Sequence, residues 1–312
     1  MAQTVDISFV PALQNQIINL YQEAAGNIRS TVRVRQITGK TDKWERLGGV
    51  ELEQVTTRHQ LTPHTPMVHS ARLAILSDFA GSEKLDKLDE VKMMIDPKSD
   101  YTQNLVNAWS RRIARTVIGS LNGNATSVDN VDTRSANAFP TSQVIANGGT
   151  GFTMAKWRQA NRLLDNAGVP RGDRTALLSA FAIEDLMADA TITSADYTSL
   201  SAIQSGTVDG AMLMGARVVM ISDAVPDDSS VVTGASSQQT PVGAILPKSG
   251  NIRQCFLYHK TAVGLSIAKD VSAEVDRLPE HLNAWQVLVQ GSLGAVRILD
   301  AGVVEIDIDE SA

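Results

Sequence analysis

The stretch from Lys87 to Ala114, KLDEVKMMIDPKSDYTQNLVNAWSRRIA, decides the fold. Its Asp96-Pro97 pair is a typical helix start, because Asp caps free N–H groups and Pro fits the first helical turn. We therefore expect a long helix from about 98 to 121, which at 1.5 Å per residue spans about 35 Å, the width of a domain. Apolar residues at every fourth position form its buried stripe: Tyr101, Leu105, Trp109, Ile113 and Val117.

Polar, extended segments precede this helix. Thr31–Ile37 alternates as a strand does, and two further extended stretches, Glu51–Arg58 and Val68–Ser77, flank a Pro-containing loop. Glu51–Arg58 has only two large apolar residues, so a hairpin here cannot bury a core of its own. Two interpretations stay open. The hairpin is an arm that lies on another subunit, or it is an edge hairpin of a larger sheet.

Two other helices are expected in the first hundred residues. Pro11 and the apolar spacing that follows it predict a short N-terminal helix ending at Gly26. From Ser82 onwards the spacing of Leu85, Leu88, Val91 and Ile95 predicts a second helix.

The rest of the chain mixes short strands and helices. Residues 122–151 predict a loop with short strands at most, and residues 155–167 a helix. After Pro170 we expect strands at 175–178, 216–221, 242–246 and 253–258, helices at 181–190 and 262–267, and a surface loop at 227–240. The final part predicts strands at 285–290 and 295–299 around a glycine turn, and a strand at 304–309. The fold class is therefore α+β.

The composition excludes several classes of protein. The 312 residues are 43% hydrophobic and 20% charged, which is typical of a folded globular protein. The 28 basic and 34 acidic residues give a net charge of −6, which argues against tight non-specific nucleic-acid binding. No apolar run approaches the roughly 20 residues that span a bilayer, and no signal-peptide pattern begins the chain, so we expect an intracellular product. The single cysteine, Cys255, excludes a disulfide scaffold and is expected to be buried.

Residues of catalytic type form no known constellation. The chain has no P-loop, no G-x-G-x-x-G after a strand, no G-x-S-x-G and no H-E-x-x-H. Histidines five residues apart fit neither one helix face nor one strand face, which favours solvated loop residues over metal ligands at His59, His64 and His69. The sequence therefore predicts no catalytic, cofactor-binding or metal site, and no enzyme.

The acidic C-terminal strand has two interpretations. Glu305, Asp307 and Asp309 share one face of this strand and could bind a cation. An acidic face of this kind more often keeps an edge strand soluble and unpaired.

The order of these elements resembles that of tailed-bacteriophage major capsid proteins of the Hong Kong 97 type. The residues that carry the resemblance are 87–101 and the helix start at 105–114, which are similar to the segment leading into the long spine helix of that family. As a residue pattern the resemblance is close between about Leu85 and Leu121. As an architecture it covers most of the chain.

The resemblance implies a division of the chain into four parts. Residues 1–30 would be an N-terminal arm, and residues 31–80 the extended β-hairpin called the E-loop. Residues 81–169 and 271–312 would form the peripheral domain with the spine helix. Residues 170–270 would form the axial domain, which surrounds the five-fold and six-fold positions.

The resemblance also implies a function. Such subunits assemble through hexamers and pentamers into the icosahedral head of the virion, in the host cytoplasm, and enclose double-stranded DNA without sequence-specific binding. No cofactor and no membrane are implied. Many relatives begin with a scaffolding segment that a protease removes, and no such segment is visible here. Either the chain is already trimmed or a separate scaffolding protein exists; Met1 favours the separate scaffolding protein, which is expected together with a portal and decoration proteins. Two alternatives stay open: an encapsulin-like compartment shell and a small-molecule α+β enzyme.

Charged residues on the hairpin and on its approach are candidates for contacts between subunits. The alternative is that each is solvated, since an exposed ion pair contributes only about 0–1 kcal/mol. The candidates are Arg33, Arg35, Arg58, Arg72, Glu51 and Glu53.

Overall fold

The structure is a computed structural model. It describes residues 28–58, 60–62, 64–85, 98–128, 133–188, 210, 212–221 and 246–311. The expected N-terminal helix, the loop at 227–240, residues 242–245 and the part of the second expected helix beyond Leu85 lie outside these residues. Among the described residues, no helix is both long and apolar enough to cross a membrane.

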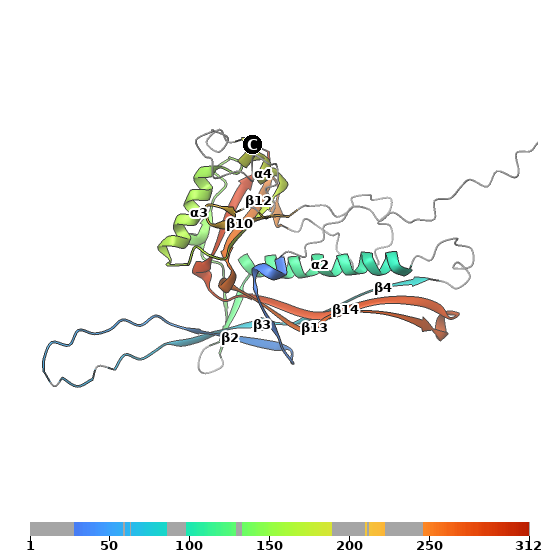
Figure 1. The fold of residues 1–312 in the computed structure, drawn as a ribbon, viewed down its shortest axis with the longest axis horizontal. Helices are drawn as coiled ribbons and strands as arrows, with labels where there is room; N and C mark the ends of the chain where they lie inside the picture. Colours follow the sequence, from blue (N-terminus) through green and yellow to red (C-terminus); the bar gives the residue numbers. More distant parts are fainter. Residues whose placement is uncertain are drawn as a thin grey trace, which may run out of the picture.

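The long helix is present where the sequence predicts it. Helix α2 spans Lys98–Asn122 and lies along a long β-sheet (Figure 1). Trp109, Ile113 and Val117 are buried as expected, and Leu105 packs against the same core while partly buried. Tyr101, near the start of the stripe, is half-buried.

The long sheet has the strand order β1-β13-β14-β4. Its strands are β1 (Arg33–Gln36), β13 (Val263–Leu278), β14 (Ala284–Arg297) and β4 (Ser77–Leu85). Two of the expected elements are wrong here. The helix expected at 262–267 is the start of β13, and the glycine turn expected between 290 and 295 is the middle of the continuous strand β14.

Close packing explains the glycines of β14. A Cβ on Gly291 would lie 2.6 Å from Cζ2 of Trp109, and a Cβ on Gly294 would lie 2.8 Å from the carbonyl carbon of Ile75. Glycine lets the backbone approach its neighbours at these two positions without a turn. The helix expected from Ser82 is also wrong at its start, because residues 82–85 pair with β14 as the end of β4.

A second sheet forms the head of the molecule, with the order β7-β15-β12-β8-β10-β9 (Figure 1). Its strands are β7 (Val144–Ile145), β15 (Val303–Asp309), β12 (Ile252–His259), β8 (Arg174–Ser179), β10 (Ala216–Ile221) and β9 (Met212–Leu213), and β11 (Lys248–Ser249) pairs with β12. The strands expected at 175–178, 216–221, 253–258 and 304–309 are confirmed. The expected helices are confirmed as α3 (Met154–Asn166) and α4 (Ala180–Ala188).

The head sheet separates two hydrophobic cores. Phe256 and Tyr258 on β12 belong to the core shared with α2, whereas Cys255 and Leu257 belong to the core shared with α3 and α4. Because alternate residues of a strand point to opposite faces, one strand supplies both cores. Cys255 is fully buried, as expected, and its burial raises the pKa of its thiol to about 12.

A third sheet, with the order β2-β3-β5-β6, lies at the base of the hairpin. It contains β2 (Thr41–Leu47), β3 (His69–Ile75), β5 (Ala125–Val128) and β6 (Arg134–Asn137). Its small core joins Trp44 and Ala74 to Val296 and Ile298 at the end of β14. The described part of the chain also contains five short 3-10 turns: η1 (Ile28–Thr31), η2 (Thr141–Gln143), η3 (Lys260–Ala262), η4 (Pro279–His281) and η5 (Asp300–Gly302).

Candidate subunit interface

The segment between β2 and β3, residues 48–68, projects away from the body of the molecule (Figure 1). Its two limbs are joined where Gly48 N–H donates to the carbonyl of Val68 at 2.9 Å. Within the loop the described residues form no strand: Glu51–Thr56 pairs in no β-ladder, and Thr57 and Arg58 lie in a bend and a turn, in contrast to the expected extended stretch Glu51–Arg58. We call residues 48–68 the extended loop.

The extended loop exposes large apolar side chains. Leu52 is 96% exposed, Leu61 90% and Val55 65%. Full burial of a side chain of this size contributes about 1.5–3 kcal/mol. Burial of these side chains on another surface would therefore add several kcal/mol of stability that the loop lacks within its own chain.

The base of the extended loop is held firmly. Trp44 on β2 is buried, and its Nε1–H donates to Oγ of Ser266 at 3.0 Å. Ser266 in turn donates to a carboxylate oxygen of Asp42 at 2.6 Å. The guanidinium of Arg35 pairs with the same carboxylate at 3.1 Å and lies 4.1 Å from the centre of the Trp44 ring. The loop therefore projects from an anchored platform.

A buried charge cluster, made of Arg72, Arg297 and Asp300, joins this platform to the end of α2. Arg297 donates to the carbonyls of Leu121 and Gly123 at 2.7 and 2.8 Å, which satisfies backbone groups at the C-terminus of the helix. The Asp300 carboxylate accepts from Arg297 at 2.7 Å and from Arg72 at 2.6 Å. Burial lowers the pKa of Arg72, and the charge of Asp300 opposes this effect.

The candidate contact residues therefore occupy different environments. Arg72 is 3% exposed and pairs with Asp300 of its own chain. It therefore stabilises the subunit itself and is not exposed for contact with a neighbour. Arg33 and Arg35, on the exposed strand β1, both lie beside the ring of Trp44 on β2. The three residues on the extended loop are all exposed: Glu51, Glu53 and Arg58.

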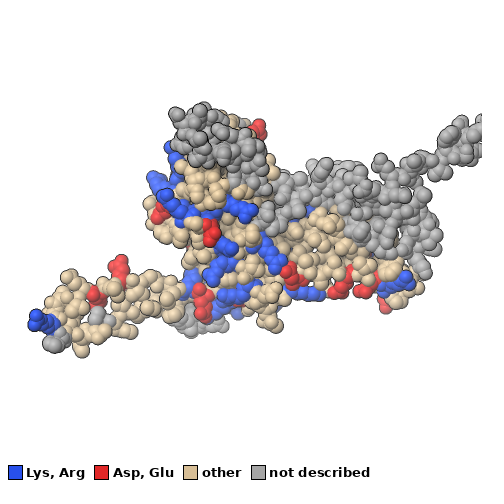
Figure 2. All heavy atoms as spheres, viewed as in Figure 1, with Lys and Arg blue, Asp and Glu red and all other residues tan. Residues whose placement is uncertain are grey.

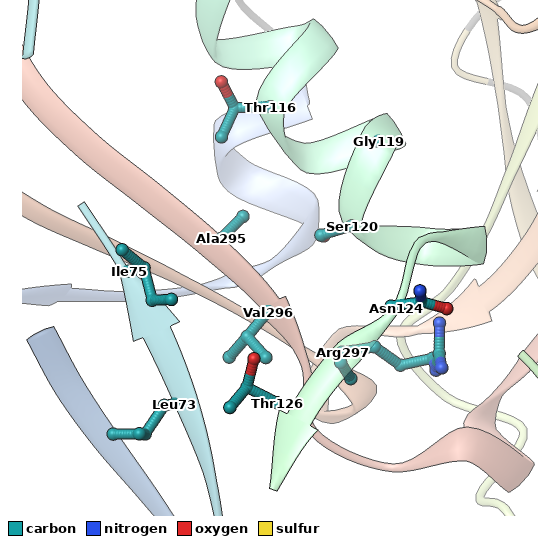
Figure 3. Close-up of a pocket in the computed structure, with 11 residues that line it drawn as sticks. Leu73, Ile75, Thr116, Gly119, Ser120, Asn124, Thr126, Ala295, Val296 and Arg297 are labelled. Carbon is teal, nitrogen blue, oxygen red and sulfur yellow. The ribbon is translucent and has the colours of Figure 1, made fainter. Parts of the chain in front are cut away.

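Two hollows lie beside these elements. The first, of about 240 Å³, is bounded by β3, α2 and β14, and its lining includes Ile75, Gly119 and Val296 (Figure 3). The second, of about 620 Å³, lies beside the start of β1 and is lined by Arg29, Ser30, Val32, Arg33, Val34 and Lys260. Sequence reasoning missed Arg29 and Lys260, because they lie outside the hairpin and far apart in the chain.

The distribution of charge differs between the body and the loop. In Figure 2, Lys and Arg gather over the middle of the visible face, between the head and the base of the extended loop.

His64 and His69 are exposed, as expected, whereas His59 lies outside the described residues. The described residues hold no group of three or more His, Cys, Asp or Glu side chains that could hold a metal ion.

The acidic C-terminal strand is not an edge strand, in contrast to the expectation. β15 lies between β7 and β12, and Glu305 is only 5% exposed. Burial, reinforced by the nearby Asp307, raises the pKa of Glu305 to about 7. Gln254 donates to Glu305 at 2.7 Å and accepts from Asn122 at 2.8 Å, so this carboxyl group belongs to a chain of hydrogen bonds between the head sheet and the end of α2.

Comparison with known proteins identifies the family. A model of the phage capsid protein family matches residues 5–310. The chain belongs to this family. No curated protein matches the sequence.

Solved capsids share the fold of this phage capsid protein. The capsid of cyanophage P-SCSP1u has a TM-score of 0.69 at 17% identity, covering 98% of this chain and 94% of that one. Cyanophage Pam1 has a TM-score of 0.66 at 14% identity, covering 100% of both chains. The capsid of Helicobacter pylori bacteriophage KHP30 has a TM-score of 0.64 at 13% identity, covering 99% of both.

These findings confirm the predicted fold and role. The protein has the α+β fold of Hong Kong 97-type capsid proteins and is a major capsid protein, with a structural and not an enzymatic function. Its place is the capsid of the virion, as part of an oligomeric shell. The encapsulin-like and enzyme alternatives are not favoured.

Proposed function

We propose that this capsid protein forms hexamers and pentamers that close into the icosahedral head of a tailed phage around double-stranded DNA. The observation that carries the proposal is the extended loop, which is anchored at its base and exposes Leu52 and Leu61 almost completely. Such a loop gains stability only on another surface, and a neighbouring subunit supplies one at every position of a shell.

The parts of the chain take roles that follow from this proposal. Residues 1–30 form the N-terminal arm and 31–80 the E-loop. Residues 81–169 and 271–312 form the peripheral domain, with α2 as the spine helix, and residues 170–270 form the axial domain. The position of the long helix over the long sheet supports the peripheral assignment.

Charged residues at the exposed surface contribute to the contacts between subunits. The five candidates that stay exposed or partly exposed are Arg33, Arg35, Arg58, Glu51 and Glu53. Each exposed ion pair contributes only about 0–1 kcal/mol, but a closed shell repeats each contact many times.

The shell encloses DNA without binding it tightly. A net charge of −6 per subunit supports this, since strong phosphate binding depends on an excess of Lys and Arg. A separate scaffolding protein guides assembly in the host cytoplasm, and a portal and decoration proteins complete the head.

The proposal is tested by replacing residues 50–66 with a short Gly-Ser turn. A larger deletion from Glu51 to Ser77 would remove β3, which lies inside the base sheet, so the shorter replacement is the clean test. We expect a folded subunit, with unchanged circular dichroism, that no longer forms shells in negative-stain electron microscopy.

A matched control keeps the loop length. In this variant Leu52, Val55 and Leu61 are replaced by Ser, which removes the exposed apolar surface alone. We expect weakened assembly and an unchanged fold. Closed shells from the loop-replacement variant would overturn the proposal, and an unfolded subunit would show that the loop belongs to the core.

A further inference from the structure

Among the residues that the structure describes, strand β1 is an edge of the long sheet. It pairs in parallel with β13, from Arg33 opposite Gly264 to Gln36 opposite Ile267, and it ends the strand order of that sheet. All four of its residues are exposed, including Val34 at 41%. An open edge presents unpaired N–H and C=O groups that can accept one more strand.

A hollow of about 620 Å³ lies against this edge. Arg33 and Lys260 bring cationic groups to it, as does Arg29, whose guanidinium pairs with Asp270 at 2.7 Å, and Val34, which is 41% exposed, brings apolar surface. The lining therefore fits an extended segment that carries carboxylates together with at least one large apolar side chain.

The extended loop contains such a segment. In Glu51-Leu52-Glu53-Gln54, the two glutamates point to one side of an extended backbone and Leu52 to the other. All four residues are exposed, and none lies in a strand of its own chain. On β1, Arg33 and Arg35 likewise share one side and Val34 takes the other.

We propose that residues 51–54 of a second copy of this chain add as a strand to the free edge of β1. With Leu52 opposite Val34, the two glutamates lie opposite Arg33 and Arg35, whether the added strand runs parallel or antiparallel. This inference rests on the proposed assembly of subunits, for which it names the receiving surface. Cross-strand ion pairs and apolar pairs then specify the register of the contact.

The test is cysteine cross-linking in assembled shells. Val34→Cys chains are mixed with Leu52→Cys chains during assembly and treated with a mild oxidant. The native Cys255 does not interfere, because it is fully buried and its thiol has a pKa of about 12. We expect disulfide-linked dimers on non-reducing gels, and a ladder of higher multimers when one chain carries both substitutions.

Leu61→Cys in place of Leu52→Cys is the matched control, because Leu61 lies on the same loop and is 90% exposed. Shells that form normally but cross-link no more than this control would overturn the inference and leave the proposed function intact. Failure of the unmodified chain to form shells under any condition would instead contradict the proposed function.

If the cysteine variants do not assemble, a charge-reversal experiment tests the same contact. Arg33→Glu is expected to lower the yield of shells about tenfold, because a weak repulsion is repeated at every contact. Only the glutamate opposite residue 33 is then changed, because the other still faces Arg35: Glu51→Lys for a parallel added strand, or Glu53→Lys for an antiparallel one, is expected to restore the yield. Equal yields with and without the compensating changes would overturn the inference.

Discussion

Asp300 carries the negative charge of the cluster that joins the base of the extended loop to the spine helix. Its carboxylate accepts hydrogen bonds from Arg72 and Arg297, which are 3% and 0% exposed. Removing one partner of a buried ion pair costs about 3–5 kcal/mol. The Asp300 side chain is 28% exposed and water will replace part of its interaction, so we expect Asp300→Ala to lower the free energy of unfolding by about 2–3 kcal/mol.

The loss of Asp300 leaves an excess of positive charge. Arg46 and Arg297 already disfavour the charged form of Arg72, and Asp300 is the group that opposes them. We therefore expect Asp300→Asn, which keeps the volume and removes the charge, to cost more than half as much as Asp300→Ala. A purely steric role for Asp300 would make the Asn variant nearly neutral.

The assay is urea unfolding of the unassembled subunit, followed by tryptophan fluorescence. A lower midpoint with an unchanged slope reports lost stability without a change in the surface exposed on unfolding. Asp276→Ala on the exposed part of β13 is the matched control and should stay within about 0.5 kcal/mol of the unmodified chain. A loss below about 1 kcal/mol for Asp300→Ala would refute the argument that this carboxylate holds the cluster together.

Two further predictions concern the core and the buried carboxyl group. Gly291→Ala places a methyl group against the Trp109 ring and should cost about 1–3 kcal/mol in urea unfolding, whereas Gly49→Ala, which meets open space, should be neutral. A raised pKa makes ionised Glu305 unfavourable in the folded state, so stability should fall as the pH rises from about 4.5 to about 7. Glu305→Gln should remove about 1–2 kcal/mol of this fall in stability, measured by urea unfolding at pH 4.5 and pH 8. An unchanged pH dependence of stability would contradict the raised pKa of Glu305.

The long helix and most of the head could be predicted from the sequence because their signals are local. The four-residue spacing from Trp109 to Val117 identifies the buried face of α2 within a few turns. The apolar run of β10 and the alternation from Val304 to Asp309 in β15 likewise lie inside each strand. Short-range patterns of this kind need no knowledge of the partner element.

Other features depend on partners far along the chain. Gly291 and Gly294 suggest a turn until Trp109 and Ile75 are known to press against them. Arg72 looks like a surface residue of a hairpin, yet its partner, Asp300, is 228 residues away. The hollow beside β1 combines Arg29 with Lys260, which no local pattern connects.

The head sheet has a mechanical consequence for the shell. β8 and β12 each send alternate side chains into two cores, so neither core can loosen without disturbing the strands that the other requires. Unfolding of the body is therefore expected to be a single cooperative event. A subunit built in this way behaves as one stiff unit, and a change in the curvature of the shell must come from the extended loop and from the sliding of one subunit past the next.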